Sequence, residues 1–228
     1  MKAMIFAAGL GTRLKHLTEH TPKALVKVGN ISLLEHVITK LKQAKVDEII
    51  INVHHFPTQI IDFVNENNNF NIEIRFSMEN DKLLDTGGGL KKASWFFDDN
   101  KPFFIHNVDV ISDIDLREMY DFHCREGAMA TLAVRNRITQ RYLLFDEKNH
   151  LCGRENLKTN ERIMASGRSL DLEFRRLAFS GINVVSPQIF EFMPEKEVFS
   201  VTDIYMNVPE KVFAYQHDYG EWADMGVV

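Results

Sequence analysis

Apolar, β-branched stretches alternate with helix-like stretches through roughly the first 135 residues of the chain. The β-branched stretches predict strands at residues 2–8, 48–53, 72–77, 103–107 and 128–134. Between them, apolar residues recur every three or four positions, which predicts helices at residues 33–43, 59–66, 89–97 and 116–125. Strand–helix alternation of this kind is typical of the α/β class, in which helices cover both faces of a mostly parallel sheet.

The pattern changes after about residue 136. Short strands are predicted at residues 142–146 and 151–153, on either side of a turn. Residues 154–176 are polar with few apolar anchors, and we interpret them as a mobile excursion. Order is expected to return with a strand at 178–185, a helix near 188–192, an ordered segment at 201–206 and a strand at 211–216.

The composition is that of an ordinary globular protein, with 45% hydrophobic and 26% charged residues in 228. A net charge of −5 argues against general binding to nucleic acid or anionic membranes. The sequence lacks an apolar run of membrane-spanning length and a signal-peptide pattern, so we expect a cytoplasmic protein. Cys124 and Cys152 lack metal-type spacing and are interpreted as buried free thiols.

Two glycines follow the first predicted strand, at the sheet edge where ligands of α/β proteins bind. Gly9 and Gly11 let backbone N–H groups approach a ligand closely, and Arg13 and Lys23 add positive charge just beyond them. This combination suits several phosphate groups. It is not a dinucleotide fingerprint, because Leu14 replaces the third glycine, and no Gly-Lys-Ser/Thr follows as in a P-loop. The alternative for a bare pair of glycines is an ordinary strand-to-loop turn.

Two aspartates are candidate metal ligands. Asp109 follows a hydrophobic strand, where a carboxylate can hold Mg²⁺ or serve as a turn or capping residue. Asp113 and Asp115 are better candidates for capping the next helix. Asp224 alone is more typical of a surface aspartate, and it can share a metal with Asp109 only if the fold brings both strand ends together.

Three consecutive glycines stand in the segment 84–90, which we expect to be a loop that opens a helix. Three glycines cost backbone entropy, so they indicate close approach or unusual dihedral angles. One interpretation is a flexible turn. The other is a flat nucleobase lying against exposed backbone, where amides and carbonyls contact its edge.

The string from Ala7 to Leu14, followed by Thr21-Pro22-Lys23-Ala24-Leu25, resembles the signature of the sugar-1-phosphate nucleotidyltransferases. Trp222-Ala223-Asp224-Met225-Gly226 matches the family's W-x-D-x-G element, and the triple glycine is most similar to the N-acetylmuramate-1-phosphate uridylyltransferases. The resemblance implies a Rossmann-like mixed sheet with a small inserted β region. It also implies one domain over residues 1–228, with a nucleotide-binding half (1–135) and a sugar-phosphate-binding half (136–228). Relatives usually continue into a closing helix, so we expect the C-terminus to be truncated.

The implied reaction joins a nucleoside triphosphate, with UTP favoured, to a sugar 1-phosphate and releases pyrophosphate. The implied catalytic residues are Arg13 and Lys23, and the implied Mg²⁺ ligands are Asp109 and Asp224. The implied nucleotide-binding residues are Ala8, Gly9, Leu10, Gly11, Thr12, Thr86, Gly87, Gly88 and Asn107. The implied residues for the sugar phosphate are Asn156, Lys158, Ser180 and Gly181.

Other functions remain open at this stage. The family includes mannose-1-phosphate guanylyltransferases, and related enzymes transfer cytidylyl groups to phosphocholine. A domain that binds a nucleotide sugar without turnover is a further alternative, favoured by Val108, which stands where most family members carry glycine.

Overall fold

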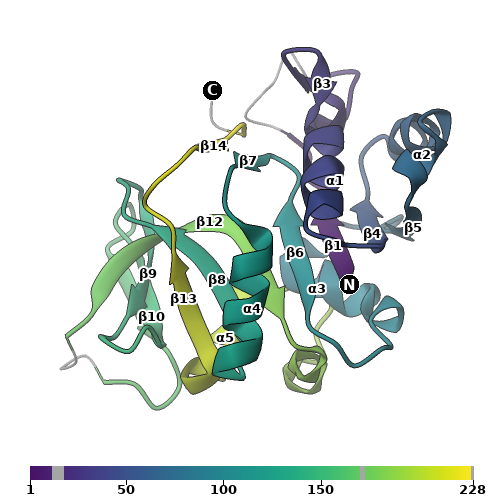
Figure 1. Ribbon diagram of the computed structural model, residues 1–228. Coiled ribbons are helices and arrows are strands. Elements are labelled where there is room, and N and C mark those ends of the chain that lie inside the picture. The colour runs from purple at the N-terminus through teal and green to yellow at the C-terminus, as the bar shows by residue number, and fades with distance from the viewer. Residues whose placement is uncertain (12–17, 170–172, 227–228) are drawn as a thin grey trace.

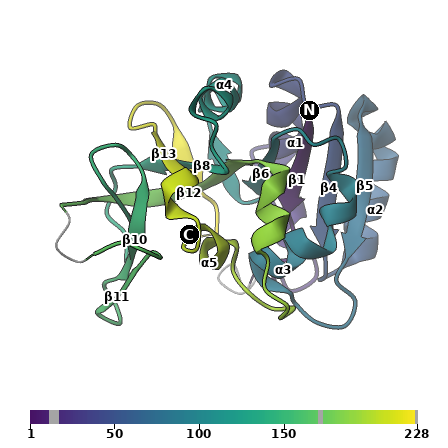
Figure 2. The same ribbon diagram turned by 90° about the horizontal axis from the view of Figure 1, so that it is seen from below.

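The computed structural model describes residues 1–11, 18–169 and 173–226. Within these residues the main sheet has ten strands, and helices lie on both of its faces (Figures 1 and 2). The elements up to residue 135 are β1 (Lys2–Phe6), η2 (Lys23–Leu25), β2 (Lys27–Val28), β3 (Ile31–Ser32), α1 (Leu33–Gln43), β4 (Glu48–Val53), α2 (Pro57–Glu66), η3 (Asn68–Asn71), β5 (Glu73–Met78), α3 (Asp85–Lys92), η4 (Ser94–Phe96), β6 (Phe103–Asn107), β7 (Val110–Ser112), α4 (Leu116–Glu126) and β8 (Ala130–Arg135). Those that follow are β9 (Arg141–Phe145), β10 (Leu151–Asn156), β11 (Glu161–Met164), β12 (Arg175–Val185), η5 (Pro187–Phe192), α5 (Val201–Tyr205), η6 (Pro209–Lys211), β13 (Val212–Gln216) and β14 (Trp222–Asp224).

The centre of the sheet is the parallel series β5-β4-β1-β6. Alternate residues of β1 point to opposite faces, as in any strand. Ala3 and Ile5 pack in the core cluster that includes α1 and α2, whereas Met4 packs in the cluster that includes α3 and α5. Both faces are therefore buried, which explains the continuous apolar stretches of β1 and β4. The predicted α/β fold with a mostly parallel mixed sheet is confirmed.

Local sequence accounts for several element boundaries. β4, β6 and α1 have the predicted bounds. The Ser32 hydroxyl accepts the Glu35 N–H at 3.1 Å and so caps α1. Asp115 accepts two backbone N–H groups at the start of α4, which confirms its predicted capping role, and Gly127 (φ +58°) ends that helix.

The second half extends the sheet with mostly antiparallel pairs, and β13 pairs with β8 in parallel fashion. β12 is the long connecting strand, because it pairs with β6 through its C-terminal part and with β9 through its N-terminal part. Its pairing with β8 shifts register between Phe179 and Asn183, where Gly181 has φ +79°. Such an irregularity bends a strand and changes where its side chains point.

Two predictions about secondary structure were wrong. The helix expected at 89–97 is instead α3, which begins at Asp85, followed by the separate 3-10 turn η4. The polar stretch 154–176 is not an excursion throughout, because it contains the end of β10, all of β11 and the start of β12. β11 is an edge strand with mostly exposed side chains, so it lacks the apolar anchors that a sequence pattern detects.

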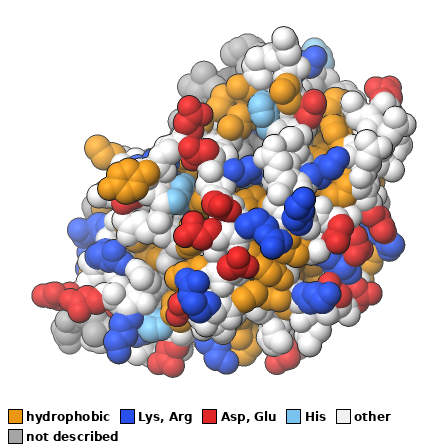
Figure 3. Space-filling view, in the orientation of Figure 1, with side chains coloured by type: hydrophobic (Ala, Val, Ile, Leu, Met, Phe, Trp, Pro, Cys, Tyr) orange, Lys and Arg blue, Asp and Glu red, His pale blue; other side chains and the backbone are white. Residues whose placement is uncertain are grey.

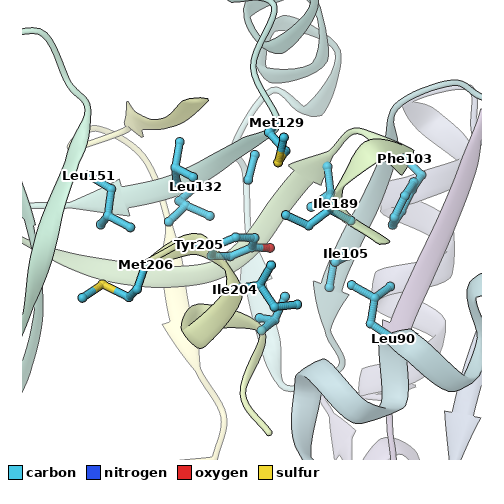
Figure 4. Packing of buried hydrophobic residues seen from close by; sticks show 14 of the residues in the cluster. Leu90, Phe103, Ile105, Met129, Leu132, Leu151, Ile189, Ile204, Tyr205 and Met206 are labelled. Carbon is cyan, nitrogen blue, oxygen red and sulfur yellow. The ribbon is translucent and has the colours of Figure 1, made fainter. Parts of the chain in front are cut away.

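The short helix α5 is anchored in the core below the sheet. Figure 4 shows Tyr205 surrounded by Ile189, Ile204 and other apolar side chains. Tyr205 is 1% exposed, and burial raises the pKa of its hydroxyl above the usual value. This anchoring holds the preceding segment, residues 197–200, against the rest of the molecule.

In the part of the chain that the structure describes, no helix has the length and apolar character needed to cross a membrane. Acidic and basic side chains are interspersed on the face shown in Figure 3. This distribution differs from the single-sign surface typical of nucleic-acid binding.

Candidate functional site

A cavity of about 500 Å³ lies at the carboxyl ends of β1, β4 and β6, where ligands of open α/β sheets bind. The segments that follow these strands, the start of α3 and two later segments all contribute to it. The lining residues are Phe6, Ala7, Ala8, Gly9, Leu10, Gly11, Lys23, Asn52, Glu79, Leu83, Asp85, Thr86, Asn107, Val108, Asp109, Val198 and Gly226. The structure thus brings most of the predicted nucleotide-binding residues to one cavity.

The glycine turn after β1 forms one end of the cavity. A Cβ added to Gly9 would have no atom within 4 Å, so the backbone there is open to the cavity side. Gly11 has φ +64°, and a Cβ there would come within 2.8 Å of Thr18 Cγ2. Glycine is therefore required at position 11 by conformation and by space. Thr12 and Arg13, the remaining predicted residues of this turn, lie outside the described residues.

Lys23 and Asp109 form an ion pair in the cavity. Lys23 begins the short helix η2, and Asp109 follows the end of β6. Their side chains are 11% and 17% exposed, so both charges are mostly removed from water. A pair of this kind holds a positive charge beside the glycine turn and a carboxylate at the neighbouring strand end.

The second predicted metal ligand, Asp224, lies on a two-stranded ribbon whose backbone adjoins that of Asp109. β14 pairs with β7 in antiparallel fashion, and Asp224 lies opposite Val110. The Met225 N–H donates to the Asp109 carbonyl oxygen at 2.8 Å. Asp109 lines the described part of the cavity whereas Asp224 does not, and one Asp224 oxygen accepts the Gly226 N–H at 2.8 Å. Mg²⁺ takes one or two protein carboxylates and completes its shell with water and substrate phosphates, so the two aspartates are candidate ligands by residue type and backbone position.

Contacts from β12 and from the segment after β8 hold this ribbon in place. The Trp222 indole N–H donates to the Ser180 carbonyl oxygen at 2.9 Å, and the Arg137 guanidinium lies 4.3 Å from the centre of the Trp222 ring. Arg137 also donates to the Phe179 carbonyl oxygen at 3.1 Å. Burial lowers the pKa of Arg137, and the negative charge of the Asp224 carboxylate opposes that shift.

A buried polar network forms the opposite end of the cavity. The Asn52 amide oxygen accepts the Ala7 N–H at 2.8 Å, and its amide nitrogen donates to Glu79 Oε1 at 2.7 Å. The other Glu79 oxygen accepts the Leu84 N–H at 3.0 Å. Sequence reasoning missed Asn52 and Glu79. The signal was available, because an amide within the apolar strand β4 needs a buried partner.

The triple glycine has a different position from the one predicted. Gly87, Gly88 and Gly89 lie inside α3 and are buried, so the expected loop is a helix. The N–H groups of Gly87 and Gly88 donate to the Phe199 carbonyl oxygen at 2.9 and 3.2 Å. A Cβ on Gly88 would overlap the Glu197 carbonyl oxygen. These glycines permit close packing of α3 on residues 197–199. Of the three nucleotide-binding residues predicted in this segment, Thr86 is the one that lines the described part of the cavity.

The predicted sugar-phosphate residues fall into two places. Asn156 lines a second cavity, of about 370 Å³, between the β9–β11 strands and the start of α5. Lys158 is exposed, and its backbone N–H donates to the Asn156 amide oxygen at 3.1 Å. Ser180 is buried with its hydroxyl 2.8 Å from His217 Nε2, and Gly181 packs against Val110. As far as the structure describes them, Ser180 and Gly181 line neither cavity.

Glu155 anchors the strands beneath the second cavity. It is 8% exposed and pairs with both Arg162 and Arg176. The hydrogen bond from Arg176, and then that from Arg162, lowers the pKa of Glu155 below its usual range, although burial opposes them. The carboxylate thus pairs with β11, which was not expected from the sequence, and with the start of β12, which begins before the predicted strand at 178–185.

Comparisons with known proteins agree with this geometry. A family model described as "Nucleotidyl transferase" matches residues 2–142. The mannose-1-phosphate guanyltransferase of Aspergillus oryzae is 37% identical over 136 residues, which cover 59% of this chain and 37% of that protein. The UTP–glucose-1-phosphate uridylyltransferase of Synechocystis sp. is 27% identical over 248 residues, covering 100% of this chain and 61% of that protein. The chain therefore spans less than two thirds of the length of these relatives.

Solved structures show the same fold. A structure of a putative glucose-1-phosphate thymidylyltransferase from Bacillus anthracis, in complex with a sucrose, has a TM-score of 0.82 at 20% identity and covers 99% of this chain and 90% of that one. HddC from Yersinia pseudotuberculosis complexed with GMP-PN has a TM-score of 0.74 at 22% identity, covering 99% and 93%.

Proposed function

Because the chain belongs to the nucleotidyl transferase family, we propose that it transfers a nucleoside monophosphate from a nucleoside triphosphate to a sugar 1-phosphate. The products are a nucleoside diphosphate sugar and pyrophosphate. One observation carries this proposal: the open glycine turn, Lys23 and Asp109 line one cavity, and β14 places the backbone of Asp224 beside that of Asp109. The relatives named above act on substrates of the same classes.

The proposed reaction needs no protein nucleophile. A sugar phosphate has a second pKa near ~6, as other phosphomonoesters do, so it is mostly dianionic at neutral pH and can attack the α-phosphorus directly. The protein must reduce repulsion between the two anions, align them and stabilise charge on the departing pyrophosphate. We assign these tasks to Lys23 and the backbone N–H groups of the glycine turn, with Arg13 as a second cation.

Asp109 and Asp224 are the residues that we propose to hold Mg²⁺. When bound, the cation would neutralise phosphate charge and orient the phosphate groups. The chain's own contribution is the β7–β14 pairing and the Met225–Asp109 hydrogen bond, which hold the backbones of the two aspartates side by side.

We place the sugar phosphate in the second cavity, beside Asn156 and Lys158. The side chains of Arg154, Ser200 and Thr202 add hydrogen-bonding groups and positive charge to its lining or rim. For the base we propose UTP, since the segment 84–90 resembles the uridylyltransferase variant. The similarity to guanyltransferases makes GTP the competing outcome.

A pyrophosphate-release screen tests the proposal. The four nucleoside triphosphates are combined with a panel of sugar 1-phosphates that includes N-acetylmuramate 1-phosphate, with and without Mg²⁺. We expect release with one combination, and a loss of release in Lys23→Met but not in Lys27→Met, because Lys27 is exposed on β2. Nucleotide binding without release from any combination would favour a non-catalytic binding domain. Preference for GTP would reject the uridylyl assignment alone.

A further inference from the structure

Asp85 combines an unusual backbone conformation with a position in the nucleotide cavity. It is the first residue of α3 and has φ +59°, a left-handed conformation that L-residues other than asparagine and aspartate rarely adopt. Its side chain is exposed to the cavity, near Leu83, Thr86 and Val198. Strained residues held at a binding site suggest a functional reason for keeping the side chain.

One oxygen of Asp85 is already used locally. Asp85 Oδ1 accepts the Thr86 N–H at 2.6 Å, which fixes the orientation of the carboxylate. An ionised carboxylate only accepts hydrogen bonds, and it has two oxygens with which to do so. Its second oxygen therefore presents an acceptor of fixed position to whatever occupies this part of the cavity.

The other carboxylates of the cavity are committed to protein partners. Three carboxylates line its described part: Glu79, Asp85 and Asp109. Glu79 is 2% exposed and uses both oxygens, one for the Asn52 amide and one for the Leu84 N–H. Asp109 pairs with Lys23 at the end assigned to phosphate. Asp85 is thus the carboxylate placed to contact the uncharged part of a nucleotide.

We propose that Asp85 selects a nucleobase with a protonated ring nitrogen on its hydrogen-bonding edge, such as uracil or guanine, over cytosine and adenine. This inference rests on the proposed function, because it takes the ligand to be a nucleoside triphosphate. Uracil N3–H and guanine N1–H can donate to the free Asp85 oxygen. In the same position cytosine N3 and adenine N1 present a lone pair, which the carboxylate repels. A site that leaves such an acceptor unpaired discriminates strongly.

Two substitutions separate this role from a purely structural one. Asp85→Gly removes the carboxylate and suits a positive φ, so it relieves backbone strain. Asp85→Asn keeps the shape and tolerates the left-handed conformation, but its amide can present either a donor or an acceptor. Asp81→Asn is the matched control, because Asp81 is an exposed carboxylate in the same loop that does not line the cavity.

The readout is the dissociation constant of each of the four nucleoside triphosphates for the full chain, measured by calorimetry without a sugar phosphate. We expect wild type and Asp81→Asn to bind UTP and GTP more tightly than CTP and ATP. In Asp85→Gly and Asp85→Asn the ratio of UTP or GTP affinity to CTP affinity should fall by at least about tenfold. The melting temperature of Asp85→Gly should be no lower than that of wild type.

An unchanged ratio in folded Asp85→Gly, or wild-type preference for CTP or ATP, would overturn the inference. A wild-type chain that binds none of the four would overturn it as well. Selective binding without pyrophosphate release would leave the role of Asp85 intact while rejecting the proposed catalysis, so the two failures are distinguishable.

Discussion

Replacing Gly88 with alanine should destabilise the fold, because α3 packs on residues 197–199 through this position. The added Cβ would overlap the Glu197 carbonyl oxygen and come within 2.9 Å of Leu84 Cβ. Neither atom can rotate away as the end of a long side chain could. The helix and the segment must separate, and the two hydrogen bonds from α3 to the Phe199 carbonyl oxygen must lengthen.

The expected cost combines three effects. Overpacking a well-packed interior costs about 1–3 kcal/mol. Weakening two hydrogen bonds adds about 0.5–1.5 kcal/mol for each. Alanine recovers about 1 kcal/mol through its higher helix propensity. The free energy of unfolding should therefore fall by about 3 kcal/mol, which corresponds to a melting temperature lower by roughly 6–12 °C for a chain of this size.

Thermal unfolding followed by circular dichroism measures this effect, and urea unfolding gives the free energy independently. Gly9→Ala is the matched control, because nothing lies within 4 Å of an added Cβ at Gly9 and its melting temperature should stay close to wild type. A Gly88→Ala variant as stable as wild type would refute the packing argument. It would also revive the interpretation of the triple glycine as an open surface for the nucleobase.

Three further outcomes are expected. Lys23→Met should lower kcat/KM by an amount that corresponds to about 2–4 kcal/mol of lost transition-state stabilisation. The same variant should bind Mn²⁺ more tightly in the ligand-free chain, because Asp109 loses its ion-pair partner, and electron paramagnetic resonance measures this binding. Asp224→Asn should abolish the Mg²⁺-dependent part of pyrophosphate release, and normal release at saturating Mg²⁺ would argue against its proposed role. Glu155→Gln should unfold about 1–2 kcal/mol more easily at pH 7 through loss of charge-assisted hydrogen bonds. Since the folded-state pKa of Glu155 is lowered, this difference should shrink as the pH falls below ~4.3, and a pH-independent difference would contradict it.

Sequence patterns predicted the parallel half well because burial there is two-sided and continuous. β4 and β6 have the expected bounds, and the apolar face of α1 repeats regularly. In the second half β9 and the start of β10 were predicted, but β11 was missed, since it is an exposed edge strand. Its position depends on pairing with β10 and on the ion pairs of Glu155, which are tertiary contacts that no local pattern encodes.

The candidate site was predictable where a motif follows a strand end, as with Gly9 and Asp109. It was not predictable where packing decides the role. Glycine favours loops by intrinsic propensity, yet Gly87 and Gly88 lie in a helix because a tertiary neighbour requires a bare backbone. Asn52 and Glu79 both line the cavity and hydrogen-bond to each other. Asn52 lies on β4 and Glu79 follows β5, so this contact depends on the pairing of those two strands.

The antiparallel ribbon of β7 and β14 determines when, during synthesis, both carboxylates proposed to hold a divalent cation are present. During synthesis the parallel series β5-β4-β1-β6 and the glycine turn can form early, because all of their residues precede Asp109. Asp224 is added roughly a hundred residues later, which takes on the order of ten seconds at 5–20 residues per second. Until then the emerging chain has the proposed phosphate-binding turn but only one of the two carboxylates proposed to hold Mg²⁺. A nascent chain should therefore retain nucleotide weakly and without dependence on divalent cations, and acquire that dependence in a single step when β14 joins the ribbon.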